Sequence, residues 1–107
     1  MESRVQESLE RLIESIRDSE VYRDYSMQLD RVKEQPGLKD KIDEFRTRNL
    51  ILQTGEHTTF EQLDSFEKEF ANFREDPLVD RFLATELALC RMLQKVNRIL
   101  VEAIHFE

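Results

Sequence analysis

The residues that could carry out chemistry in this chain are few, and one pair near the C-terminus has a recognisable spacing. Glu102 and His105 stand three residues apart, which is the spacing used for carboxylate and imidazole ligands in di-iron helical bundles. Such a centre needs a second pair of this kind and two further inward glutamates, and the chain has a single pair. Glu102 also falls on the polar side of its helix. We therefore expect a solvated pair, and the alternative is a metal-dependent hydrolase or oxidase that uses these two residues.

Nucleophilic chemistry has no support in the sequence. Cys90 is the single cysteine, and it lies among leucines with no histidine placed to activate it, so we predict a buried structural thiol. His57 stands beside Glu56 in a loop without a second ligand near it in the sequence. The serines lack a glycine elbow, and the chain has no glycine-rich phosphate loop. We expect no catalytic residue, no metal and no cofactor, and hence a protein that is not an enzyme.

Composition favours one helical domain, residues 1–107. Hydrophobic residues make up 39% and charged residues 36%, with two glycines and two prolines, a balance that suits helices joined by few turns. The net charge of −7 argues against direct contact with nucleic acid, which needs a basic surface. There is no signal peptide and no apolar run near the ~18 residues that a membrane span needs. We therefore expect a cytoplasmic protein that does not bind membranes.

Hydrophobic residues at helical spacing predict about five helices. The first runs from about Glu2 to Arg17, and Asp18 or Ser19 offers the N-cap of the second. The second helix ends before the break at Pro36-Gly37, and a third follows this break.

The last two predicted helices begin at recognisable caps. Thr58 and Glu61 form a capping-box pattern after the loop that starts at Gly55. Asp76 is a cap followed by proline at the first helical position, and the helix that it opens runs to His105. The expected architecture is all-α: an antiparallel bundle of about five helices with a long C-terminal helix.

The long C-terminal helix carries the clearest functional signal. From Leu87 to Ile104 its apolar residues cover about 200° of the helical wheel, roughly twice the stripe that a surface helix buries. Such a helix must be covered on two sides, either as the centre of its own bundle or as half of a dimer. The candidate interface residues on this helix are Leu89, Leu93, Val96, Asn97, Leu100 and Ile104. Asn97 could fix register or partner choice if it is buried, or it could lie at the edge of the apolar arc and bond to water.

Two further side-chain stripes leave alternatives open. An aromatic stripe on the fourth helix is expected to be core, or else an acidic aromatic groove for a partner helix. Its members are Phe60, Phe66, Phe70 and Phe73. A basic strip on the polar side of the last helix is expected to be solvated, or else to contact an acidic partner. Its members are Arg91, Lys95 and Arg98.

Three stretches carry a resemblance to a known family. They are DSEVYRDY at 18–25, KEQPGLKDKIDEFR at 33–46, and EDPLVDRFLATELALCRMLQKVNRIL at 75–100. In this order and spacing the chain resembles the YlbF/YmcA family of small helical regulators from Gram-positive bacteria. The resemblance covers nearly the whole chain, from about Val5 to Ile104.

The resemblance implies an all-α domain that forms homodimers or mixed complexes with paralogous subunits. It implies a non-enzymatic regulatory role in competence, biofilm formation or sporulation, in part by modulating a ribonuclease. It also marks Tyr22, Tyr25 and Asn97 as interface or core-specifying residues. Some members carry a C-terminal cysteine cluster associated with iron–sulfur binding, and the single Cys90 argues against such a role here. The competing hypothesis is a structural homodimeric module that binds a partner helix through the acidic aromatic face.

Overall fold

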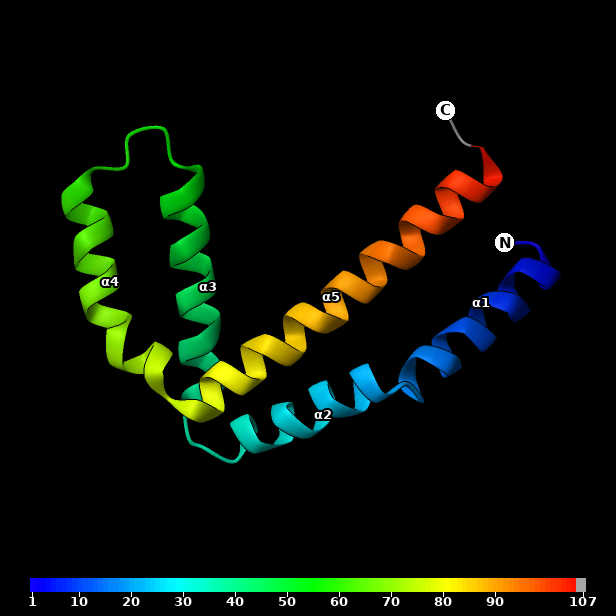
Figure 1. The fold of residues 1–107 in the computed structure, drawn as a ribbon, viewed down its shortest axis with the longest axis horizontal. Coiled ribbons are helices and arrows are strands. Elements are labelled where there is room, and N and C mark those ends of the chain that lie inside the picture. Colours follow the sequence, from blue (N-terminus) through cyan, green and yellow to red (C-terminus); the bar gives the residue numbers. More distant parts are fainter. Residues whose placement is uncertain (106–107) are drawn as a thin grey trace. The chain divides into compact units, whose positions relative to one another are not determined.

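The computed structural model describes residues 1–105, and this part of the chain contains helices and no strand (Figure 1). The helices are α1 (Ser3–Arg17), α2 (Glu20–Lys33), α3 (Leu38–Thr54), α4 (Phe60–Glu75) and α5 (Pro77–Ile104). The predicted all-α class and the long C-terminal helix are confirmed. The predicted ends were close: α1 starts at Ser3 instead of Glu2, and α5 stops at Ile104 instead of His105.

Side-chain caps explain where α2 and α5 begin. The Ser19 hydroxyl accepts a hydrogen bond from the backbone N–H of Tyr22 at 3.2 Å. This bond gives an acceptor to one of the N–H groups that a helix start leaves unpaired. At the start of α5 the Asp76 carboxylate accepts from the N–H of Leu78 at 2.9 Å. Pro77 is the first residue of α5 and has no N–H to satisfy. Both predicted starts are confirmed.

The predicted cap of α4 was wrong by one residue. Thr59, not Thr58, is the N-cap, and it exchanges hydrogen bonds with Gln62 instead of Glu61. The physical reason is that Thr58 has another partner: its hydroxyl donates to the carbonyl of Leu52 at 2.9 Å and so ties the loop to the end of α3.

Left-handed residues mark two helix boundaries. Gly37 has a φ of 75° directly before α3, a conformation that glycine adopts without a side-chain penalty. His105 has a φ of 59°, and its N–H bonds back to the carbonyl of Glu102 at 3.2 Å. This turn of the backbone ends α5 after Ile104.

The chain divides into two compact units, which are described separately. The hairpin unit is Leu29–Phe82, with the last residues of α2, all of α3 and α4, and the first residues of α5. The α1–α5 unit consists of Met1–Gln28 and the described residues from Leu83 onward. The single domain over residues 1–107 stays a prediction.

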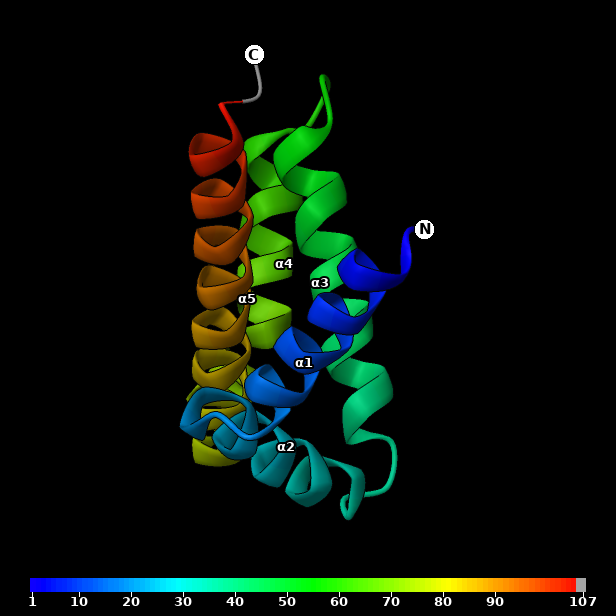
Figure 2. The same ribbon diagram turned by 90° about the vertical axis from the view of Figure 1, so that its right-hand side faces the viewer.

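The hairpin unit contains every buried hydrophobic residue among the described ones. In this unit α3 and α4 pack side by side in opposite directions (Figures 1 and 2). Its core is mostly aromatic, and the rings of Phe45 and Phe66 stack with centroids 5.5 Å apart. The buried apolar residues are Val32, Ile42, Phe45, Phe66, Phe70, Phe73, Val79 and Phe82.

Cations cover the edges of this aromatic core. The Arg48 guanidinium lies 5.2 Å from the ring centroid of Phe70, and that of Arg74 lies 5.0 Å from the centroid of Phe45. Such contacts add about 0.5–1 kcal/mol each at exposed sites. The aliphatic parts of the arginine side chains also cover ring surface that two packed helices alone would leave open to water.

The predicted core character of the aromatic stripe is confirmed for three of its four members. Phe66, Phe70 and Phe73 are buried, whereas Phe60 is exposed. An aromatic groove formed by all four residues is therefore wrong, because three of the rings already fill the core of the hairpin unit.

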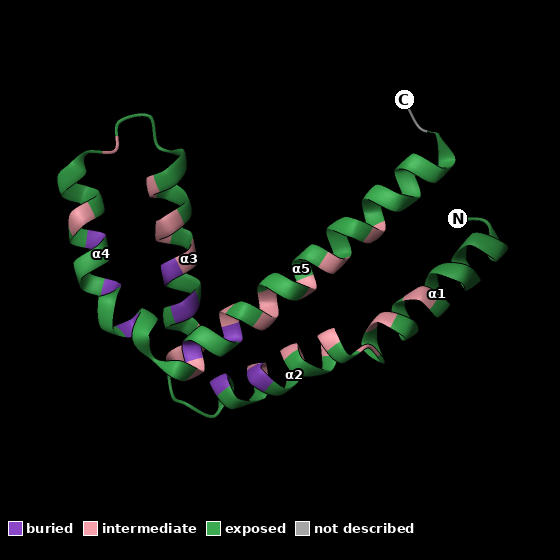
Figure 3. Ribbon diagram, viewed as in Figure 1, coloured by how far each residue is buried: buried purple, intermediate pink, exposed green. Residues whose placement is uncertain are grey.

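The α1–α5 unit has no buried hydrophobic residue among those described. Figure 3 shows α1 without any buried position, and the second half of α5 is mostly exposed, with intermediate positions at Met92 and Val96. In this unit α1 and the second half of α5 run in opposite directions (Figure 1). The expectation that the long helix is covered on two sides is not met by this chain alone.

Candidate interaction surface

Helix α1 carries an apolar stripe along one side. Val5, Leu9, Leu12 and Ile16 recur at helical spacing and share one face. Leu12 and Ile16 are half-buried, and Val5 and Leu9 remain exposed. The stripe thus faces a neighbour that covers only part of it.

Helix α5 supplies the second stripe. Leu89 and Val96 are half-buried, and Leu93, Leu100 and Ile104 are exposed. Each lies three or four residues from the next, so all five share one broad side of the helix. The structure therefore places the predicted apolar interface residues of α5 on one continuous surface.

The two stripes meet at an open groove of about 550 Å³ within the α1–α5 unit. Val5, Leu9 and Leu12 line one side of this groove, and Leu100 lines the other. We call this surface the α1–α5 face, and its members are Val5, Leu9, Leu12, Leu89, Leu93, Val96, Leu100 and Ile104. The contribution of α1 was not predicted from the sequence: its stripe was visible, but spacing alone does not say whether a stripe is covered.

The exposure of the α1–α5 face is large for a monomer. Its exposed members Val5, Leu9, Leu93, Leu100 and Ile104 keep between 38% and 70% of their surface accessible. Covering ~400 Å² of such surface would contribute about 10 kcal/mol at ~25 cal/mol per Å², before the costs of association. Exposed apolar surface of this extent is characteristic of interaction sites, and this makes the α1–α5 face the candidate interaction surface.

The other predicted interface residues lie on α5 and α2. Asn97 is exposed on α5, and on the helical wheel it lies between Ile104 and Cys90, at the edge of the apolar arc. Tyr22 and Tyr25 are half-buried on α2, and their ring centroids are 6.3 Å apart. The interface and specificity roles of these residues stay predictions.

Cys90 does not have the predicted surroundings. The structure leaves it exposed, because it stands on the flank of α5, away from the half-buried positions Leu89 and Val96. A buried structural thiol is therefore wrong for this chain.

Metal ligands do not gather in the part of the chain that the structure describes. Glu102 and His105 are both exposed, and residues 1–105 contain no group of three acidic, histidine or cysteine side chains that could hold a metal ion. Among the same residues, no helix is both long and apolar enough to cross a membrane.

Comparison with known proteins decides the family. A model of the YlbF/YmcA proteins, described as control of the competence regulator ComK, matches residues 5–105. The chain belongs to the YlbF/YmcA family. The match covers both helices of the α1–α5 face and the whole hairpin unit, and the family is a regulatory one.

A curated relative is also similar to this YlbF/YmcA chain over most of its length. A UPF0342 protein of Staphylococcus saprophyticus is 27% identical over 97 residues, which span 87% of this chain and 85% of the relative. No solved structure gives a significant match. The resemblance inferred from the three sequence stretches is thus confirmed by the family match.

Proposed function

We propose that this protein is a non-enzymatic regulator that acts by assembling through its α1–α5 face. The occupant of that face is a second copy of the chain or a paralogous YlbF/YmcA subunit. The observation that carries the proposal is the exposure of two adjoining apolar stripes, on α1 and α5, in a unit without a buried hydrophobic residue among those described.

The charge pattern of α5 supports association through its apolar side. The basic strip of Arg91, Lys95 and Arg98 is exposed and lies on the other side of the helix. Water can solvate this strip. The leucines on the opposite side are stabilised only when another apolar surface covers them and removes them from water.

The pathway is the finer part of the proposal. The family description, control of the competence regulator ComK, supports a role in competence, and the resemblance extends this to biofilm formation or sporulation. Paralogous subunits and a ribonuclease are the proposed partners, and the cytoplasm is the proposed site of action.

A purely structural homodimer is the second candidate. It requires the same α1–α5 face and no regulatory target. The form of this hypothesis in which an acidic aromatic face binds the partner has lost its support, because Phe66, Phe70 and Phe73 are buried. Both candidates predict an oligomeric mass for the purified protein. Only the regulatory candidate predicts further partner proteins in the cell.

Native co-purification from the host separates the two candidates. The tagged wild type should recover paralogous family subunits or a ribonuclease, and a Leu93→Asp/Leu100→Asp variant should lose them. A control is Gln94→Asp, which adds a charge at an exposed position of the same helix outside the α1–α5 face. Recovery of the chain alone by the wild type would contradict the regulatory assembly. Stoichiometric metal in the purified protein would contradict the non-enzymatic role.

A further inference from the structure

Helix α5 carries two seams of side chains, and its own chain covers only one of them. One seam is half-buried and consists of Thr85, Leu89, Met92 and Val96. The other seam, which we call the exposed seam, consists of Cys90, Leu93, Asn97, Leu100 and Ile104. With about 100° between successive residues, the centres of the two seams lie about 90° apart around the helix. The exposed seam is therefore turned away from the neighbours that partly cover the first.

The exposed seam has the spacing of a coiled-coil contact. Its members follow one another at intervals of three, four, three and four residues, so they occupy alternating a and d positions of a heptad repeat. Leu93 is 44% accessible, Leu100 is 49% accessible and Ile104 is 70% accessible. Side chains at such positions are normally buried against a facing helix. The described helices of this chain leave the exposed seam without one.

The exposed seam carries no charge, although the chain as a whole has a net charge of −7. The charged side chains of this stretch lie on other sides of α5. They are Arg91, Lys95, Arg98 and Glu102. Two copies of an acidic chain repel each other least where neither surface is charged. A second copy can therefore approach along this seam without placing like charges against each other.

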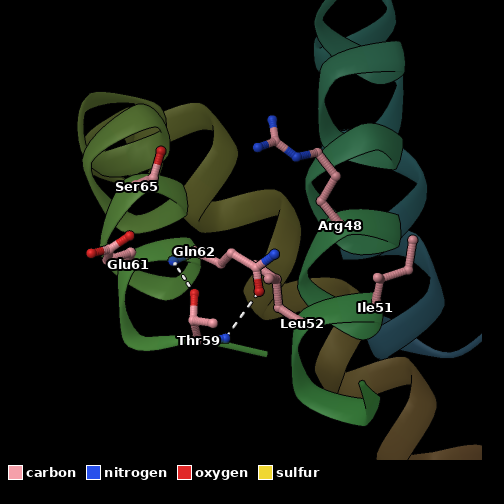
Figure 4. A pocket seen from close by; sticks show the side chains of 7 residues that line it. All are labelled: Arg48, Ile51, Leu52, Thr59, Glu61, Gln62 and Ser65. Carbon is pink, nitrogen blue, oxygen red and sulfur yellow. Dashed lines mark hydrogen bonds between the residues drawn. The ribbon is translucent and has the colours of Figure 1, made fainter. Parts of the chain in front are cut away.

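The open groove of the hairpin unit lacks such a pattern. It has a volume of about 570 Å³, and Ile51 and Leu52 supply its apolar lining (Figure 4). These two residues are adjacent in sequence, so they do not form a seam at heptad spacing. Polar side chains line the rest, and Thr59 and Gln62 already bond to each other. The exposed seam of α5 is therefore the surface better suited to a facing helix.

Asn97 stands in the middle of the exposed seam, with two members before it and two after it. Covering its amide with an apolar surface would cost free energy, because the amide would lose its hydrogen bonds to water. A second amide at the same position offers both a donor and an acceptor. The intervals place Asn97 at an a position, where a single asparagine fixes the register and the number of helices.

We propose that α5 of a second copy packs along the exposed seam, with Asn97 of one copy facing Asn97 of the other. The inference rests on the proposed function, since it names the occupant of the α5 part of that surface and the residue that sets its register. A helix with an apolar residue opposite Asn97 would leave the amide without a hydrogen-bond partner. The asparagine thus selects a matching copy over other apolar helices.

Opposite charges at position 97 test this contact in the full-length purified protein. Asn97→Asp and Asn97→Lys each place like charges against each other in a dimer of one variant, and each should weaken self-association by at least about tenfold. An equal mixture of the two variants brings a carboxylate to an ammonium group. This mixture should associate within about threefold of the wild type. Sedimentation velocity, with one variant carrying a fluorescent label, measures all three.

Two variants on the polar side of α5 are the matched controls. Lys95→Gln makes the same change in net charge as Asn97→Asp, and Glu102→Gln makes the same change as Asn97→Lys. Both positions are exposed and lie outside the exposed seam. Each control should associate within about twofold of the wild type. Position 97 is exposed as well, so circular dichroism should show the same helical fold for all four variants.

Cross-linking tests the same contact without a change in charge. Cys90→Ser removes the native thiol, which is exposed. Adding Asn97→Cys to this background should give a covalent dimer under mild oxidation, because position 97 faces itself whether the two helices run parallel or antiparallel. Adding Lys95→Cys instead should give little covalent dimer, because position 95 lies on the polar side of α5.

The outcomes separate this inference from the proposed function. A wild type that assembles while the Asn97→Asp and Asn97→Lys mixture fails to recover would overturn the facing asparagines and leave assembly through the α1–α5 face intact. Equal cross-linking from positions 95 and 97 would do the same. A monomeric wild type would overturn both the inference and the proposed assembly.

Discussion

Individual phenylalanines of α4 have opposite surroundings although they share one helix. Phe70 is buried between the rings of Phe45, Phe66 and Phe73, with centroids 5.0 to 5.5 Å away. Phe60 is exposed at the start of the helix. Phe60 stands six residues before Phe66, a spacing that turns it to a different side of α4 from the three buried rings.

Alanine substitution should separate these two positions. Phe70→Ala removes a fully packed ring, and we expect it to lower the free energy of unfolding by about 3–5 kcal/mol. Phe60→Ala should change it by no more than about 0.5 kcal/mol. Urea denaturation followed by circular dichroism measures both. Equal losses would contradict the assignment of Phe70 to the core.

Acid should weaken the contact between α3 and α4. The hydrogen bond from Arg48, with its positive charge, lowers the pKa of the Glu69 carboxyl below its ordinary value of 4.5. A carboxyl with a lowered pKa in the folded state stabilises the fold above its unfolded pKa, and this contribution is lost as pH falls through the folded pKa.

Glu69→Gln should therefore lose less stability than the wild type on acidification. Comparing unfolding free energies at about pH 7 and about pH 3 measures the difference. Glu75→Gln is the control, because Glu75 forms no ion pair with another described residue. If both variants follow the acid profile of the wild type, the Arg48–Glu69 pair contributes nothing to stability.

At the scale of elements, the helices were predictable and one cap was not. Asp76 was identified because proline follows it at the first helical position and no equal competitor stands beside it. For α2 the sequence left Asp18 and Ser19 open, and the hydrogen bond from the N–H of Tyr22 shows that Ser19 is the cap. Two adjacent threonines precede α4, and the sequence pattern alone did not choose correctly between them. The hydrogen bond from Thr58 to the carbonyl of Leu52 decides the matter, because it ties Thr58 to the end of α3, and the capping-box pattern does not include this contact.

Paired substitutions at the α4 cap test this assignment. Thr59→Ala should cost about 1 kcal/mol, as expected for loss of a threonine cap. Gln62→Ala should also destabilise the fold, because its side chain accepts from the N–H of Thr59, whereas Glu61→Ala should have a smaller effect. Thermal unfolding of the three variants measures the order. A larger loss for Glu61→Ala than for Gln62→Ala would restore the originally predicted cap.

At the scale of the whole molecule, the two units differ in how much of their apolar surface a single chain can bury. The hairpin unit buries a core of its own, and the α1–α5 unit leaves its apolar stripes exposed. The sequence predicted the width of the stripe on α5 and the candidate residues Leu93, Leu100 and Ile104. It could not show that α1 shares the face, nor which surface covers it, because those facts depend on the arrangement of separate helices.

The oligomeric mass in solution is the measurement that tests the central claim most directly. Light scattering or sedimentation equilibrium should give the wild type at least twice the monomer mass, and the Leu93→Asp/Leu100→Asp variant the monomer mass. Gln94→Asp, at an exposed position on α5, should keep the mass of the wild type. A monomeric wild type over the full concentration range, or an aspartate variant that still assembles, would contradict assembly through the α1–α5 face.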